Sequence, residues 1–181
     1  MLEEKLAVWR FRQGRVEGLR WIYDRYKADL LGLAVMLTGD VDRSEDAVQD
    51  VFLRLARSYD TIRIRGNLRN YLITCLMNRI RTLRRDAGRS VERQFDATPT
   101  HVSEVHQPEH WASLNEQMHQ IGQALGQLPP EQREVVTLRF HAGLGFRQIA
   151  RIQNASINTV QGRFRYGMEK LRSLLNGEVT R

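Results

Sequence analysis

The chain of 181 residues is long enough for one ordinary domain or two small ones, and its 41% of hydrophobic residues is normal for a globular protein. A single cysteine excludes an internal disulfide, no apolar run approaches the roughly 18 residues of a membrane span, and the N-terminus has no cleavable signal pattern, so we expect the reducing cytoplasm and no membrane insertion. The net charge of +7 points to a polyanionic partner, most often nucleic acid.

Apolar residues recur with helical spacing along nearly the whole chain, and no alternating segment of useful length predicts a strand. A short first helix is expected to end near Gly14, and a longer one runs from Glu17 to a stop at Gly39 and Asp40. The stripes that predict these helices are Leu2, Leu6 and Trp9 in the first, and Leu19, Ile22, Tyr23, Tyr26, Leu30, Leu33, Ala34 and Leu37 in the second. We therefore expect an all-α fold.

The third predicted helix carries one leucine on the wrong side. Asp42, with Glu45 three residues later, has the spacing of a capping box and predicts where this helix begins. Its apolar face holds Val48, Val51, Phe52, Leu55 and Ala56. Leu53 falls on the opposite face, among Asp46, Gln49, Asp50 and Arg57. One exposed leucine is normal on any protein, but an apolar centre with a polar rim also fits a protein-docking patch.

The next segment is strongly basic, because no acidic residue occurs from Thr61 to Arg85. A helix is predicted from about Leu68 to Arg85, with Leu68, Leu72, Cys75, Leu76, Ile80 and Leu83 as its buried stripe. Its outer face would hold Asn70, Ile73, Thr74, Met77, Arg81, Arg84 and Arg85, with Tyr71 and Asn78 at the margin. Aromatic, amide and arginine side chains suit single-stranded DNA. The alternative is a solvated basic face with Tyr71 in the core.

Residues 89–112 are polar, contain two prolines and show no hydrophobic period, so we interpret them as a linker between two domains, 1–88 and 113–181. No nucleophile, base and orienting group form a catalytic motif, and no glycine-rich phosphate loop occurs in the sequence. We therefore expect no enzyme activity and no cofactor. We also expect no metal site at the linker histidines, which lack a scaffold and a cysteine: His101, His106 and His110.

The second predicted domain begins near Ser113. Pro129 and Pro130 end one helix and start another, since proline is tolerated in a first turn. Gly143 then closes that second helix. The apolar stripes are Leu114, Met118, Ile121, Leu125 and Leu128 in the first helix, and Val135, Val136 and Phe140 in the next.

Residues 145–175 predict a helix-turn-helix. A short helix precedes Asn154, which tolerates the left-handed conformation of a tight turn, and Ser156 is a good N-cap for the longer helix that follows. The core stripe of that helix is Ile157, Val160, Phe164, Met168, Leu171 and Leu175. Its other faces carry Asn158, Thr159, Gln161, Gly162, Arg163, Arg165 and Tyr166, which suit a major groove. The alternative is a three-helix bundle with a merely solvated basic face.

Together these motifs resemble a known family. DVDRSEDAVQDVFLRL followed by NLRNYLITCLMNRIRTLRR resembles region 2 of bacterial sigma factors. LPPEQREVVTLRFHAGLGFRQIARIQNASINTVQGRFRYGMEKLRSLL resembles their region 4. Only these two regions are present, joined by a short linker, which is the layout of the extracytoplasmic-function group of the sigma-70 family. The resemblance covers about residues 14–88 and 113–175.

The resemblance implies a promoter-specificity subunit of bacterial RNA polymerase, a monomer when free. Region 2 would dock on the β′ clamp helices through Asp46, Gln49, Asp50, Leu53 and Arg57. It would also recognise the −10 element and help to open the duplex through Arg63, Arg65, Asn67, Arg69, Asn70, Tyr71, Asn78 and Arg81. Region 4 would contact the β flap and read the −35 element through Asn158, Thr159, Gln161, Arg163, Arg165 and Tyr166. Members of the family often work with an anti-sigma factor, and the sequence leaves open whether this chain has one.

The chain departs from the family pattern at several positions. Tyr71 stands where tryptophan is common, Thr82 replaces an aspartate, and Asn154 replaces the usual turn glycine. Gln161 and Gly162 stand where lysine and serine are common, which should alter the −35 preference. Two rival functions stay open: a helix-turn-helix regulator that recruits no polymerase, and a sigma-like adaptor that has lost promoter function.

Overall fold

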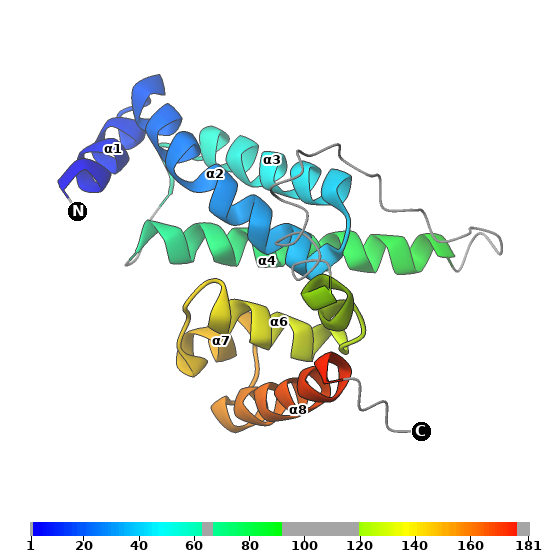
Figure 1. The fold of residues 1–181 in the computed structure, drawn as a ribbon. Helices are drawn as coiled ribbons and strands as arrows, with labels where there is room; N and C mark the ends of the chain where they lie inside the picture. Colours follow the sequence, from blue (N-terminus) through cyan, green and yellow to red (C-terminus); the bar gives the residue numbers. More distant parts are fainter. Residues whose placement is uncertain (1, 63–66, 92–119, 177–181) are drawn as a thin grey trace, which may run out of the picture. The chain divides into compact units, whose positions relative to one another are not determined.

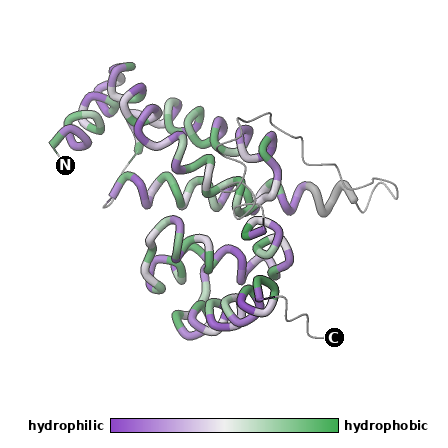
Figure 2. Tube along the Cα trace, in the orientation of Figure 1, coloured by the Kyte–Doolittle hydropathy of each residue, from purple (hydrophilic) through white to green (hydrophobic). Residues whose placement is uncertain are grey.

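The computed structural model describes residues 2–62, 67–91 and 120–176, and these parts of the chain contain no strand. The all-α prediction is therefore confirmed for them. The helices are α1 (Leu2–Arg12), α2 (Val16–Thr38), α3 (Val41–Arg57), α4 (Leu68–Val91), α6 (Pro130–Phe140), α7 (Phe146–Gln153) and α8 (Ile157–Leu175), with further helical residues at 120–126 (Figure 1). Figure 2 shows apolar and polar residues alternating along each helix, as expected where one face is buried.

The helices form two compact units. The first contains α1, most of α2, α3 and α4, and the second contains α6, α7 and α8. α4 continues through Val91, so the first three residues of the predicted linker, 89–91, are helical. The rest of that linker lies outside the described residues, as do its three histidines and the predicted stripe residues Leu114 and Met118.

The first helix turns its predicted stripe outward. α1 packs through Ala7 and Phe11, whereas Leu2, Leu6 and Trp9 are exposed. The reason is the close approach of α1 to α2: a Cβ atom added at Gly18 would lie 2.3 Å from the backbone nitrogen of Phe11. Only the face of α1 that carries Ala7 and Phe11 meets α2 at this point, so the helix was predicted correctly but its buried face was not. The α1–α2 turn itself contains Gly14 at φ +73°, a value that favours glycine.

The third helix begins earlier than predicted. Gly39 adopts φ +71° after α2, and Asp40 is the N-cap residue of α3 because its carboxylate accepts a hydrogen bond from the Arg43 amide at 3.0 Å. Asp42, the predicted cap, lies inside the first turn instead. The extended backbone of Asp40 places its side chain where the free amides at the start of the helix can reach it. The sequence has an aspartate at both 40 and 42, so it did not show which of the two caps the helix.

Helix α4 is buried over more of its circumference than one stripe. Leu68, Leu72, Leu76 and Ile80 are buried as predicted. Ile73 and Met77, which were expected on the outer face, are fully buried as well. The predicted stripe was therefore too narrow, because periodicity shows where burial is centred and not how many neighbours surround the helix.

The second unit has its own core, formed by Ala124, Leu125, Leu128, Val136 and Leu171. Gly167 brings α8 close to α6, since a Cβ atom there would lie 3.0 Å from Cγ2 of Val136. Phe140, predicted as core, lies at the last residue of α6 and is 65% exposed. Its only ring contact among the described residues is a tilted one with Phe164, with 5.8 Å between centroids. Ile121, Ile157 and Leu175 are also more exposed than their stripes predicted.

The helix-turn-helix prediction is confirmed in detail. Asn154 adopts φ 49° and ψ 48° between α7 and α8, which is the left-handed conformation expected of the turn residue. The Ser156 hydroxyl accepts a hydrogen bond from the Thr159 amide at 3.0 Å, so it caps α8. The turn at Asn154 and the cap at Ser156 thereby fix where α7 ends and where α8 begins.

Candidate protein and nucleic-acid interfaces

The outer face of α3 is a small apolar spot inside a polar rim. Leu53 is 48% exposed, whereas Val48, Val51, Phe52 and Leu55 on the other face are buried. The predicted rim residues Asp46, Gln49 and Arg57 are exposed around it. The structure thus brings the predicted protein-docking residues together on one helix face. We call Asp46, Gln49, Asp50, Leu53 and Arg57 the Leu53 face.

Asp50 also has a structural partner. Its carboxylate forms an ion pair with Arg79 of α4 at 2.5 Å, and both side chains are about one-third exposed or less. This pair ties the edge of the Leu53 face to α4. Arg79 was not among the predicted functional residues, and the sequence holds no signal for the pair, because 29 positions separate two residues that only the fold brings together.

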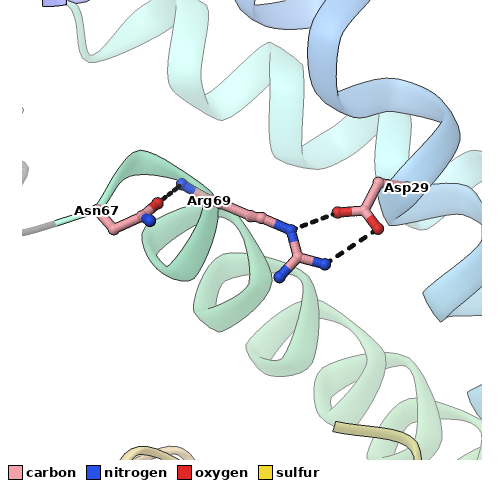
Figure 3. A network of polar contacts seen from close by, with 3 residues as sticks. All are labelled: Asp29, Asn67 and Arg69. Atoms are coloured by element: carbon pink, nitrogen blue, oxygen red, sulfur yellow. Dashed lines mark hydrogen bonds and ion pairs between the residues drawn. The ribbon is translucent and has the colours of Figure 1, made fainter. Parts of the chain in front are cut away.

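The start of α4 is fixed by a polar network. The Asn67 side chain accepts a hydrogen bond from the Arg69 amide at 2.7 Å. The Arg69 guanidinium donates to both carboxylate oxygens of Asp29 in α2, at 2.8 and 3.1 Å (Figure 3). A two-pronged pair of this kind is geometrically specific. Arg69, predicted as a DNA contact, therefore anchors α4 to α2, and its partner Asp29 was missed by sequence reasoning.

The remaining predicted region-2 DNA residues follow Arg69 along α4. Asn70, Tyr71 and Arg81 are partly exposed, and Asn78 is exposed. Arg63 and Arg65 lie outside the described residues. The structure therefore keeps these α4 side chains accessible on one helix, which begins shortly after the two arginines in the sequence.

Residues of α3 and α4 line a hollow of about 240 Å³, among them Tyr71 and Cys75 together with Arg54, Ser58 and Asn78. Burial raises the pKa of Tyr71 to about 12, and a hydrogen bond with Cys75 adds to the effect. Burial also raises the pKa of the Cys75 thiol, against the opposing influence of Tyr71 and Arg54. Tyr71 is thus partly inserted between the two helices, and Cys75 is a half-buried thiol beside it.

The outer face of α8 presents polar and aromatic side chains. Asn158, Thr159, Gln161 and Arg165 are exposed, and Tyr166 is 54% exposed. The Arg165 guanidinium lies over the Tyr166 ring at 4.9 Å and donates a hydrogen bond to its hydroxyl at 3.2 Å. This stacking orders two long side chains on the face that the helix-turn-helix turns outward.

Arg163 has a different position from its neighbours. Its guanidinium donates to the Gln153 side chain at 2.8 Å, and the Gln153 amide donates to the Glu131 carbonyl at 3.0 Å. The chain of contacts links α8 to the end of α7 and the start of α6. Arg163 is half-buried and holds the recognition helix in place, a role that its place in the sequence did not indicate.

Two family models match the chain. Sigma-70 region 2 matches residues 22–90, which comprise most of α2, α3 and α4. Sigma-70 region 4 matches residues 118–171, which include α6, α7 and most of α8. The sigma factor EcfG of Rhodopseudomonas palustris is 31% identical over 147 residues, 81% of this chain and 78% of its own.

The chain belongs to the extracytoplasmic-function group of the sigma-70 family. The sigma factor SigL of Mycobacterium tuberculosis is likewise 31% identical, over 87% of this chain and 88% of its own. The crystallised sigma factor RpoE of Bartonella quintana, in complex with the anti-sigma factor NepR, has a TM-score of 0.70 at 24% identity over 92% of this chain and its whole length, so it shares the fold.

The membership sets the broad role. This sigma factor is a bacterial transcription initiation factor that acts with RNA polymerase and promoter DNA through regions 2 and 4. The family is one of initiation factors and not of enzymes. Within the described ranges, no helix is long and apolar enough to cross a membrane, and no three His, Cys, Asp or Glu side chains are grouped to hold a metal ion.

Proposed function

We propose that this sigma factor docks on the β′ clamp helices of core RNA polymerase through the Leu53 face, and that its two units then read the −10 and −35 elements. The observation that carries the docking part is the exposure of Leu53 at the centre of a polar rim, on a helix that buries Val48, Val51, Phe52 and Leu55 on its opposite face. A regulator that recruits no polymerase would leave this apolar spot without a use. An apolar centre inside a polar rim is the usual composition of a protein interface.

In region 2, the −10 reader we propose is the loop 63–67 together with the accessible side chains of α4. Asn70, Asn78 and Arg81 supply hydrogen-bond donors and acceptors, and the Tyr71 ring offers a stacking surface at the edge of the α3–α4 hollow. Arg69 contributes through position, since its bond to Asp29 orients the first turn of α4. Arg63 and Arg65 remain predicted contacts.

In region 4, α8 enters the major groove and Arg165 is the proposed base reader, because arginine pairs with guanine through two hydrogen bonds. Asn158, Thr159, Gln161 and Tyr166 lie exposed on the same helix and complete the −35 contact. Arg163 supports this surface from behind by its bond to Gln153. The β flap contact implied by the family remains part of the proposal for this unit.

Regulation by an anti-sigma factor is proposed by analogy with RpoE, whose solved structure contains the anti-sigma factor NepR. We further propose that the sigma factor acts in the cytoplasm, since its one cysteine cannot form an internal disulfide and a reducing compartment suits it, and that it is a monomer when free, as its family implies. Co-expression with a candidate anti-sigma factor tests the proposed regulation. The two proteins should co-purify, and the sigma factor in that complex should no longer bind core polymerase.

The Leu53→Asp variant tests the docking surface. A charge at the apolar centre should lower affinity for core polymerase at least tenfold, since each 1.4 kcal/mol is a factor of about ten and truncated interface anchors often cost ~2 kcal/mol. The measurement is co-elution with core polymerase across a concentration series. Transcription from a promoter library should fall in parallel.

The matched control is Val41→Asp, which places the same charge in the first turn of the same helix, at another exposed apolar residue. It should leave polymerase affinity within about twofold, because an acid near a helix N-terminus is favourable. If both variants bind core polymerase as the parent chain does, the Leu53 face is not the docking surface.

A further inference from the structure

Helix α1 turns three large apolar side chains into solvent. Leu2 is 86% exposed, Leu6 46% and Trp9 52%. They stand four and three positions apart along the chain, so they lie on one side of the helix. The opposite side carries Ala7 and Phe11, which are buried. The region-2 match begins only at residue 22, so the family assignment gives this outer side of α1 no role.

Basic side chains border this apolar stripe on both of its sides. At about 100° per residue, Arg10 falls on one border, and Lys5 and Arg12 fall on the other. All three side chains are exposed. A lysine or arginine at such a border keeps its apolar stem against the stripe while its charge reaches away from it. We call Leu2, Lys5, Leu6, Trp9, Arg10 and Arg12 the α1 face.

Nearby acidic residues offset this positive charge only in part. Burial raises the pKa of Tyr26 in α2, and the Glu4 carboxylate, which accepts a hydrogen bond from the Tyr26 hydroxyl, raises it further. Glu4 is therefore turned away from the α1 face, whereas Glu3 is exposed at its border. The Arg15 guanidinium lies 5.8 Å from the centroid of the Trp9 ring and adds one positive charge beside the stripe. The α1 face is thus apolar at its centre and positive at its borders.

We propose that the α1 face binds the surface of a membrane that contains anionic lipids. The proposal goes beyond the proposed function and does not depend on it. A helix with an apolar stripe and basic borders lies in the plane of the membrane surface, where the stripe meets the acyl chains and the cations meet anionic headgroups. Tryptophan is enriched at this depth. The cytoplasmic leaflet is negatively charged, so its charge is complementary to that of the α1 face.

The length of α1 makes this binding peripheral and reversible. The helix has 11 residues, about half of what a membrane span requires. Its apolar stripe and its cations must therefore act together, since neither is sufficient for stable anchoring. A protein groove would need acidic residues along both of its walls to match the two basic borders, whereas a bilayer with anionic lipids presents negative charge on every side of the helix. Binding of this kind holds a fraction of the free sigma factor at the membrane surface.

Co-sedimentation of the full chain with vesicles tests the α1 face. Vesicles of equal parts phosphatidylglycerol and phosphatidylcholine should bind the chain at least about tenfold more tightly than vesicles of phosphatidylcholine alone, because each basic residue contributes a factor of about five. Leu6→Asp should lower affinity for the anionic vesicles at least about tenfold, since it removes buried methylene groups and adds a negative charge. Leu2→Asp should do the same at unchanged melting temperature, because this side chain is outside the core.

The matched control is Val41→Asp, which places the same charge at an apolar residue of α3 that is 40% exposed. It should change vesicle affinity less than about twofold, because the 23 residues of α2 separate it from α1 and charges beyond about 10 Å are screened. In the same way, Arg12→Gln should lower the affinity about fivefold, whereas Arg43→Gln in α3 should have less than a twofold effect.

Trp9 provides a readout that belongs to this face. On binding to anionic vesicles, the tryptophan emission of the chain should shift to shorter wavelength, because the Trp9 indole leaves water for the membrane interface. Trp9→Phe should abolish this shift and keep most of the vesicle affinity, since the ring stays apolar. The chain has two other tryptophans, so a full shift in Trp9→Phe would place one of those at the membrane and overturn the proposal.

The outcomes are distinct from those of the proposed function. If the parent chain does not bind anionic vesicles, or if Leu2→Asp and Leu6→Asp bind them as the parent does, the α1 face is not a membrane site. If these variants lose affinity for core polymerase and keep their affinity for vesicles, the face is a protein contact and the proposal is overturned. Docking through the Leu53 face is judged separately, by the binding of Leu53→Asp to core polymerase.

Discussion

Arginines that are similar in sequence have two different roles in this sigma factor. Arg69, Arg79 and Arg163 each bond to a side chain of another helix and are at most half-exposed. Arg165 lies on an outer face and stacks on an exposed tyrosine. Local charge density therefore indicates a nucleic-acid partner, but it does not tell which guanidinium reaches that partner and which one holds two helices together.

Arg165 and Arg163 make a matched pair for a DNA-binding test. Arg165→Ala should lower affinity for a duplex that carries a selected −35 element by about tenfold. The reason is that an arginine contact to a base through two hydrogen bonds contributes ~1–3 kcal/mol. Arg163→Ala should mainly lower the melting temperature, because it removes the bond to Gln153. Titration of the duplex and thermal unfolding of both variants would check this. The assignment is wrong if Arg163→Ala loses more duplex affinity at unchanged stability.

The half-buried pair Tyr71 and Cys75 predicts a specific pH dependence. Folding raises the pKa of both groups, so the folded chain favours their neutral forms. The resulting contribution to the free energy of unfolding is complete below the unfolded pKa values, 10.0 for Tyr71 and 9.0 for Cys75. It is lost as the pH rises through the folded values. Melting temperature should thus show no loss from this pair between pH 7 and about pH 9 and should decline above it.

The same pair governs thiol chemistry. Since the thiolate is the reactive form, the only cysteine should react slowly with a disulfide reagent at about pH 8 in the folded chain and much faster after unfolding in urea. Equal rates in the two states would show that Cys75 is not held between α3 and α4.

At the scale of elements, close contacts decide which face of a helix is buried. Gly18 lets the backbone of α1 approach α2, and this contact selects Ala7 and Phe11 as the inner residues of α1. Its consequence is that Trp9 points outward. Gly167 does the same for α8 against α6. Small residues that look neutral in the sequence thus determine which surfaces remain available for binding.

Gly18→Ala tests the first of these contacts. The added methyl would lie 2.3 Å from the backbone of Phe11, so α1 must shift, and we expect a loss of about 1–3 kcal/mol in the free energy of unfolding. The control is Gly162→Ala in α8, where nothing lies within 4 Å of the new methyl. It should stabilise by up to ~1 kcal/mol, because alanine is the better helix former. Chemical denaturation measures both, and equal effects would contradict the packing of α1.

At the scale of the molecule, the two units carry separate recognition tasks. The Leu53 face belongs to the first unit and Arg165 to the second. Neither unit need bind tightly by itself, since engagement of one raises the effective concentration of the other at its site.

This separation predicts additivity. In a Leu53→Asp and Arg165→Ala double variant, core polymerase affinity should match that of Leu53→Asp, and duplex affinity should match that of Arg165→Ala, each within about 0.5 kcal/mol. Both affinities are measured on the full chain. A double variant that departs from either single value by more than this would show that the two surfaces are coupled.

Local patterns of the sequence determined the helical class, the two regions, the left-handed Asn154, the Ser156 cap and the exposed Leu53, because each depends on residues within a few positions of one another. Tertiary structure alone decided the rest. It buried Ile73 and Met77, moved the α3 cap to Asp40, turned Trp9 outward and paired Arg69 with Asp29 across 40 positions. Helical period gives the direction of one buried face, whereas the number and position of the neighbours that cover a helix depend on how the folded chain brings distant segments together.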